Sequence, residues 1–163
     1  MATITFKDQE SYFQKLKMLD DAFRKGETIE KAVYVGAGVV ADAIRECLEA
    51  LPEDNFARLR PGEVFSVVSP QQKEDLAAGF GLSDITRDKK GFVYTKAGFE
   101  GYGSYPTRSY PKGLPNVLLA RSIEKGSSVR LRNPFIEKAT RSSKERAVNA
   151  MDQVIENEIK KII

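Results

Sequence analysis

The stretch AVYVGAGVVADAI, residues 32–44, contains the residue types and spacing of a nucleotide-binding turn. Gly36, Gly38 and Ala41 follow the G-x-G-x-x-A pattern, in which glycines let the backbone approach a pyrophosphate at a helix N-terminus. That motif needs a strand before it and a second parallel strand after it. Residues 52–61 contain two prolines and no apolar run that would supply the second strand.

The same stretch also fits the middle of an amphipathic helix. Apolar or small residues recur every three or four positions from Ile29 to Leu51, which favours one helix from about Thr28 to Pro52. On this interpretation the two glycines mark close packing against a neighbouring element. A small nucleotide-binding enzyme that uses VGAGVVAD is the alternative, and we favour the helix.

Residue types that commonly carry catalysis are scarce in this chain. It has no histidine, which removes the commonest general base and every Ser-His or Cys-His arrangement. The single Cys47 lies on the apolar stripe of the predicted helix, where we expect a reduced, buried thiol. A zinc site would need carboxylates for most of its ligands. We therefore expect no enzyme, no cofactor and no metal site.

Charge is spread unevenly along the 163 residues. Residues 1–55 carry 7 basic and 11 acidic side chains, whereas residues 56–163 carry 19 basic and 12 acidic side chains. This asymmetry suits copies of one protein that meet acidic face to basic face. It also suits a nucleic-acid-binding module that uses the basic segment 121–146. No apolar run is long enough to span a bilayer, so we expect no membrane partner.

The overall pattern predicts an α+β fold with a small central antiparallel sheet, two N-terminal helices, short helices and a long C-terminal helix. We expect a single domain over residues 1–163. Its N-terminal helices occupy residues 8–51, and a hairpin and loop region occupies residues 52–132. The C-terminal helix occupies residues 134–163.

Local signals mark several of these elements. Ser69-Pro70-Gln71-Gln72 has a serine cap, a proline at the first helical position and a glutamine three residues after the cap. Residues 85–95 are typical of a β-hairpin with a charged turn. Asn116 and Asn133 are each expected to cap a helix through the side chain.

Two groups of residues are candidates for a subunit interface. Residues 99–116 form a predicted loop whose tyrosines are of the type enriched where proteins meet, although they would also fit against the chain's own core. Residues 127–132 are expected to be extended, so that Arg130 and Arg132 project to one face and Val129 and Leu131 to the other. The candidate residues are Tyr102, Tyr105, Tyr110, Arg130, Arg132, Asp42, Glu46 and Glu49.

The two arginines have two possible partners. They would hold the DNA phosphate backbone if their face lined a channel, or pair with acids of a neighbouring subunit. We favour the neighbouring subunit, because the acidic half of the chain needs a partner.

Two short motifs lie close together in the second half of the chain: A-R-S-I-E-K-G-S-S at residues 120–128 and N-P-F-I-E-K-A at residues 133–139. With them, the chain from about Glu30 onward resembles the tail-completion or head–tail joining proteins of tailed bacteriophages, commonly described as minor tail proteins. In that family a helix ends in an acid–x–Gly–Ser/Thr turn, and a Pro-Phe pair opens the last helix. The matching residues here are Glu124, Gly126, Asn133, Pro134 and Phe135.

The resemblance implies a non-enzymatic virion protein of a tailed phage or prophage, made in the bacterial host cytoplasm. It implies a homo-oligomer, a sixfold ring at the neck or tail. The expected partners are the connector and the tail-tube or tail-terminator proteins, and non-specific contact with DNA in the channel is allowed.

Overall fold

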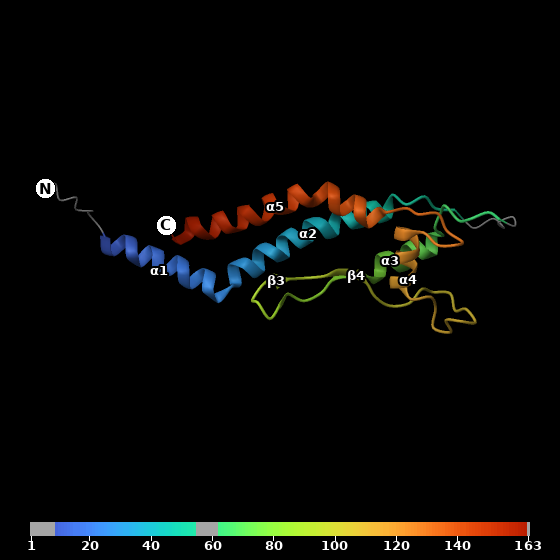
Figure 1. The fold of residues 1–163 in the computed structure, drawn as a ribbon, viewed down its shortest axis with the longest axis horizontal. Coiled ribbons are helices and arrows are strands. Elements are labelled where there is room, and N and C mark those ends of the chain that lie inside the picture. Colours follow the sequence, from blue (N-terminus) through green and yellow to red (C-terminus); the bar gives the residue numbers. More distant parts are fainter. Residues whose placement is uncertain (1–8, 55–61, 163) are drawn as a thin grey trace.

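The computed structural model describes residues 9–54 and 62–162, and its fold is α+β and mostly helical (Figure 1). The helices are α1 (Gln9–Lys25), α2 (Glu27–Glu49), α3 (Pro70–Gly79), α4 (Asn116–Lys125) and α5 (Phe135–Ile162). The strands are β1 (Phe80–Leu82), β2 (Thr86–Arg87), β3 (Val93–Tyr94) and β4 (Ala97–Phe99). Asp8 and Ile163, at the predicted helix ends, and residues 55–61 lie outside the described residues. The α+β prediction is confirmed.

The molecule is elongated, with its helices along the long axis (Figure 1). α2 and α5 run side by side in opposite directions, α1 lies at one end, and α3 and α4 lie at the other. The strands form two separate antiparallel pairs, β1 with β4 and β2 with β3, rather than one central sheet. The β2–β3 pair confirms the predicted hairpin. The β1–β4 pair, in which Phe80 faces Phe99, was not predicted.

Small side chains form the contact between α2 and α5. On α5 the small buried residues recur every four positions, at Ala139, Ser143 and Ala147. Such a row lets two helix backbones approach closely, because little side-chain volume separates them. Ser143 is fully buried, and its hydroxyl donates a hydrogen bond of 2.7 Å to the Ala139 carbonyl within the same helix. The pairing therefore leaves no unsatisfied hydroxyl.

The two glycines of the VGAGVVAD stretch lie in the interior of α2, which is continuous from Glu27 to Glu49. Their backbone N–H groups are not at a helix N-terminus, so they are not available to bind a pyrophosphate. A Cβ at Gly36 would lie 2.6 Å from Cγ of Met151 on α5, whereas a Cβ at Gly38 would have no atom within 4 Å. The prediction of close packing is confirmed for Gly36 and wrong for Gly38.

This difference gives a matched pair of substitutions. Gly38→Ala is expected to raise the free energy of unfolding by about 1 kcal/mol, since alanine favours the helix and meets no obstacle. Gly36→Ala is expected to lower it by about 1–2 kcal/mol, because the added Cβ would lie 2.6 Å from Cγ of Met151 and overpack that contact. Urea denaturation of both variants measures the difference. Equal effects of the two substitutions would contradict the close contact at Gly36.

The hydrophobic core lies where α2, α3, α4, α5 and the β1–β4 pair converge. The Phe80 and Phe99 ring centroids are 5.0 Å apart, and Phe99 meets Phe135 edge-on at 6.1 Å. Ser69 caps α3 as predicted, and the reciprocal bond between its N–H and the Gln72 side chain completes a capping box. Cys47 is half-buried against this core.

Candidate subunit interface

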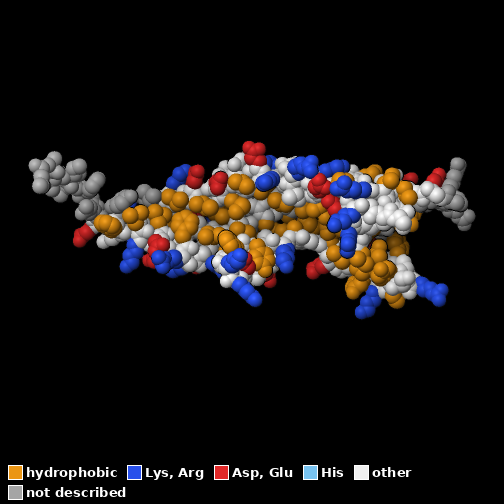
Figure 2. Space-filling model, in the orientation of Figure 1, with side chains coloured by type: hydrophobic (Ala, Val, Ile, Leu, Met, Phe, Trp, Pro, Cys, Tyr) orange, Lys and Arg blue, Asp and Glu red, His pale blue; other side chains and the backbone are white. Residues whose placement is uncertain are grey.

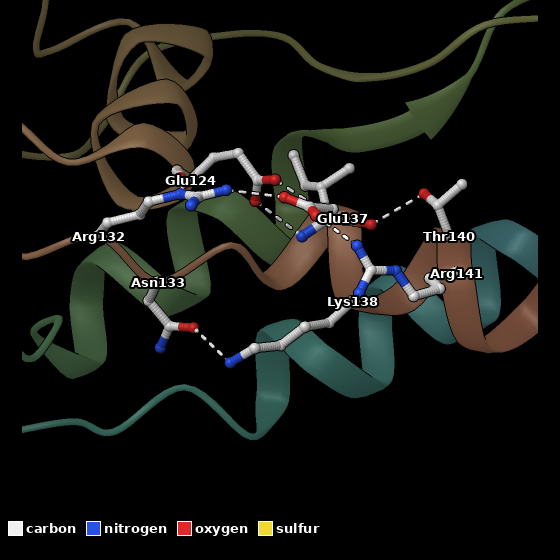
Figure 3. Close-up of polar contacts among 8 residues, drawn as sticks. Glu124, Arg132, Asn133, Glu137, Lys138, Thr140 and Arg141 are labelled. Atoms are coloured by element: carbon white, nitrogen blue, oxygen red, sulfur yellow. Dashed lines mark hydrogen bonds and ion pairs between the residues drawn. The ribbon is translucent and has the colours of Figure 1, made fainter.

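Glu124 and Asn133, two residues of the family-like motif, lie at the joint between α4 and α5 (Figure 3). The carboxylate of Glu124, near the end of α4, accepts hydrogen bonds from the backbone N–H groups of Ile136 at 2.8 Å and Glu137 at 3.0 Å. These N–H groups belong to the first turn of α5 and have no partner within that helix. Glu124 therefore caps α5 from another helix, with a negative charge at the positive end of the helix dipole.

The prediction that Asn133 caps α5 is wrong. Its side-chain oxygen accepts a bond of 3.4 Å from Nζ of Lys138, whereas its backbone carbonyl accepts from the Phe135 N–H at 2.8 Å. The charged carboxylate of Glu124 already occupies the two N–H groups that an asparagine cap would use. Pro134 precedes the first residue of the helix, and the Phe135 ring is buried, with 1% of the residue exposed.

Asn116 does not cap α4 either. It is the first residue of α4, after Pro115, and its side chain points into the protein. Nδ2 donates to the backbone carbonyls of Asp75 at 3.1 Å and Glu100 at 2.9 Å. Asn116 therefore joins α4 to α3 and to the residue that follows β4, and these tertiary bonds replace the local cap that the sequence favours.

Gly126 allows the chain to reverse between α4 and α5. Its φ of 77° lies in the left-handed region, where residues other than glycine are strained. A Cβ at this position would also lie 3.1 Å from the Arg132 backbone nitrogen. Both observations explain a glycine in the motif, and Ser127 then bonds across a tight turn to Arg130.

Arg130 and Arg132 do not project to one open face, so that prediction is wrong. Arg130 is only 8% exposed, and one of its guanidinium nitrogens donates to the Val67 carbonyl at 2.6 Å. The guanidinium also lies over the Phe65 ring, and burial lowers its pKa. Val129 and Leu131, predicted on the opposite face, are both exposed. The backbone at Arg130 forms a parallel β-bridge with Phe65, and this pairing turns the arginine side chain inward.

Arg132 lies on the surface and belongs to a chain of ion pairs. Its guanidinium contacts one oxygen of Glu137 at 2.7 Å, and Arg141 contacts the other at 2.8 Å (Figure 3). Both arginines are exposed, so each pair contributes little to stability. Two of the arginines in the basic segment therefore have an internal acidic partner.

Replacement of Arg130 tests whether this residue stabilises the fold of the single chain or serves only a subunit contact. Arg130→Ala is expected to lower the free energy of unfolding by about 1–3 kcal/mol, because it removes the donor to the Val67 carbonyl. The control Arg132→Ala is expected to cost less than about 1 kcal/mol, as for other exposed ion pairs. Chemical denaturation measures both. Equal stability of the Arg130→Ala variant and the unsubstituted chain would contradict the buried role.

The acidic candidates lie on the exposed side of α2. Asp42 pairs with Arg45 one turn along the helix at 2.8 Å. Glu46 and Glu49 are exposed, and their carboxylates have no partner among residues 9–54 and 62–162. No ion pair links any of the three to Arg130 or Arg132 within the chain.

The three tyrosines are exposed and do not pack into the core. They lie on a loop with a fixed base, in which the Gly103 N–H donates to the Leu114 carbonyl at 2.8 Å. The Asp75 carboxylate accepts from the backbone N–H and the hydroxyl of Ser104 at 2.8 and 2.6 Å. The loop therefore presents Tyr102, Tyr105 and Tyr110 on an anchored support, which suits a contact surface.

The anchor predicts a pH dependence. Burial alone would raise the pKa of Asp75, but the hydrogen bonds from Ser104 and Gln71 outweigh it and lower the pKa below 3.8. Stabilisation by this carboxylate is therefore complete above 3.8 and is lost as the pH falls through the lower folded-state pKa. Asp75→Asn is expected to flatten the loss of stability in acid. Chemical denaturation across a pH series measures the free energy of unfolding of this variant, and Asp84→Asn, at an exposed residue, is the control. If Asp75→Asn loses stability in acid as steeply as the unsubstituted chain, the anchoring role of Asp75 is contradicted.

Hydrophobic side chains form a continuous band over α1, α2 and α5 on the face in Figure 2. Among the exposed apolar residues of these helices, Phe13 is 64% and Val148 48% exposed. This surface was not predicted from the sequence. The other exposed large apolar residues of these helices are Leu16, Met18, Ile29 and Tyr34.

No protein-family model, curated protein or solved structure matches this chain. None of the helices in residues 9–54 and 62–162 is long and apolar enough to cross a membrane. In the same residues no group of three or more Cys, Asp or Glu side chains is placed to hold a metal ion. The likeness to phage tail-completion proteins rests on the sequence motifs alone.

Proposed function

We propose that this chain is a structural virion protein of a tailed phage or prophage and forms part of a head–tail joining or tail-completion ring. The observation that carries the proposal is the apolar band along α1, α2 and α5 (Figure 2). Contiguous apolar surface that stays exposed on a folded chain is a candidate interaction site. We therefore infer that this band contacts other protein subunits.

The motif residues support the phage assignment. Glu124, Gly126 and Phe135, which carry the resemblance, hold the joint between α4 and α5. A role in the fold explains why a short motif of this kind contains no active site. The proposed partners are further copies of the chain in a sixfold ring, with the connector on one side and the tail-tube or tail-terminator protein on the other. Its place is the virion.

The two alternative functions have less support. The nucleotide-binding interpretation needs a turn at Gly36 and Gly38, and both lie inside α2. The nucleic-acid interpretation needs an open basic segment. In segment 121–146, however, Arg130 is buried, and Arg132 and Arg141 form ion pairs with Glu137.

The gene for this chain can be silenced in the phage or prophage that carries it. We expect DNA-filled heads and complete tails to accumulate unjoined, because a missing neck ring removes the surface that connects them. Electron microscopy of the lysate counts joined and unjoined particles, and expression of the unsubstituted chain in trans is the control. Normal numbers of joined, infectious particles without the chain would contradict the proposal.

A further inference from the structure

A single residue, Gly26, separates α1 from α2. Its φ of 76° lies in the left-handed region, and the chain bends there so that α1 contacts the C-terminal end of α5 (Figure 1). No side chain caps the start of α2. The backbone N–H groups of Glu27, Thr28 and Ile29 therefore have no acceptor within their own helix. With a helical φ at Gly26, α1 and α2 would join into one helix, and carbonyl groups of α1 would accept these bonds.

Arg87 of β2 holds the bend from outside. Gly26 is buried, and a Cβ at this position would overlap the Arg87 guanidinium, 2.6 Å from Cζ. Nε and Nη2 of Arg87 both donate to Oε1 of Glu30, at 3.1 and 2.7 Å. Glu30 lies in the first turn of α2, beside the bend. Because 42% of the Arg87 side chain and 39% of the Glu30 side chain are exposed, this ion pair is weak enough to open.

Packing holds α1 only loosely in the bent position. Among the side chains of α1 that the structure describes, none is buried, and the half-buried apolar ones are Leu19, Ala22 and Phe23. The ion pair between Arg24 and Asp20 is internal to α1. No ion pair within residues 9–54 and 62–162 joins α1 to another element. An element with so few buried contacts opens at a small cost in free energy.

We propose that Gly26 is a hinge with two positions, and that the ion pair between Arg87 and Glu30 is the latch that holds the bent one. In the open position one continuous helix runs from Gln9 to Glu49, and α1 leaves α5. The open position gains the backbone hydrogen bonds at the junction, whereas the bent position gains the latch and the α1–α5 contact. A glycine inside a helix is unfavourable, which keeps the bent position populated.

The hinge does not depend on the proposed function, because it follows from the contacts of the single chain. Opening uncovers the apolar stripe of α1 and the end of α5 at the same time. Both surfaces then become available together, and the latch controls when.

Gly26→Ala tests the hinge in the full chain, because alanine is strained at this φ, overlaps the Arg87 guanidinium and favours a helix interior. Spin labels are placed at the exposed sites Gln14→Cys on α1 and Asn157→Cys on α5, with Cys47→Ser. We expect mainly a short distance between the labels with Gly26 present, and mainly a longer one in Gly26→Ala. Arg87→Ala, which removes only the latch, is expected to give both distances.

Hydrogen exchange distinguishes a continuous helix from an unfolded α1. In Gly26→Ala the amides of residues 27–29 are expected to exchange at least about tenfold more slowly, because they become paired inside a helix. Gly91→Ala is the matched control. It strains a glycine with a φ of 85° near the β2–β3 turn, where a Cβ meets no atom within 4 Å, so label distance and exchange are expected to stay unchanged.

An unchanged label distance in Gly26→Ala would overturn the hinge. So would a longer distance with faster exchange of residues 27–29, because α1 would then be unfolded rather than continuous with α2. A single short distance in Arg87→Ala would overturn the latch. None of these results bears on whether the chain lies in the virion, which the gene-silencing experiment decides.

Discussion

Phe135→Ala is expected to lower the free energy of unfolding by about 3–5 kcal/mol. The ring is 1% exposed and meets Phe99 edge-on in the core where α5 begins. Truncation to alanine leaves a cavity between α5 and the β1–β4 pair, and a rigid core collapses only partly into it. Chemical denaturation measures the loss.

Phe92→Ala is the matched control for this experiment. Phe92 is 68% exposed, next to the β2–β3 turn, so its removal is expected to change stability by less than about 0.5 kcal/mol. A Phe135→Ala protein with unchanged stability but defective assembly would instead place the ring at a subunit contact.

Glu124→Ala is expected to cost about 2 kcal/mol, because one substitution removes both hydrogen bonds to the first turn of α5. It also removes a negative charge from the positive end of the helix dipole. Chemical denaturation measures the loss, and the loss of helix signal in circular dichroism follows the same transition.

Two variants control this prediction. Glu124→Gln keeps an acceptor oxygen but loses the charge, so its loss is expected to be intermediate. Asn133→Ala is expected to change stability by less than about 0.5 kcal/mol, since its side chain bonds only the exposed Lys138. A large loss for Asn133→Ala with none for Glu124→Ala would assign the cap to the asparagine.

Local sequence signals predicted the elements that local interactions determine. The Ser69 capping box and Pro70 mark the start of α3, and Gly26, with a φ of 76°, separates α1 from α2. The helical period across Gly36 and Gly38 outweighed the nucleotide-binding pattern, and α2 is a continuous helix.

The remaining features depend on contacts between residues far apart in the sequence. Asn116 and Asn133 carry the usual cap signal. The Asn116 side chain instead bonds α3 and the residue after β4, and Glu124 on another helix takes the place of Asn133 as the cap. The sequence predicts that Arg130 lies on the surface, because most arginines in proteins are exposed. In the structure its guanidinium is buried against the Val67 carbonyl and the Phe65 ring. No local pattern reveals such partners.

The open apolar surface could not be found from the sequence for a related reason. A stripe such as Leu16, Leu19 and Phe23 indicates that a helix has an apolar face, but not which surface covers it. Only the arrangement of α1, α2 and α5 shows that two helices side by side leave one face of the pair uncovered. That surface is the basis of the proposed function.

A cryo-electron microscopy reconstruction of particles that carry this chain tests its proposed place in the virion most directly. We expect a sixfold ring at the neck or tail end, with density that fits the α2–α5 pair and lies between the connector and the tail tube. A particle in which the chain is found only in the capsid shell or the tail fibres, or is absent, would contradict the account.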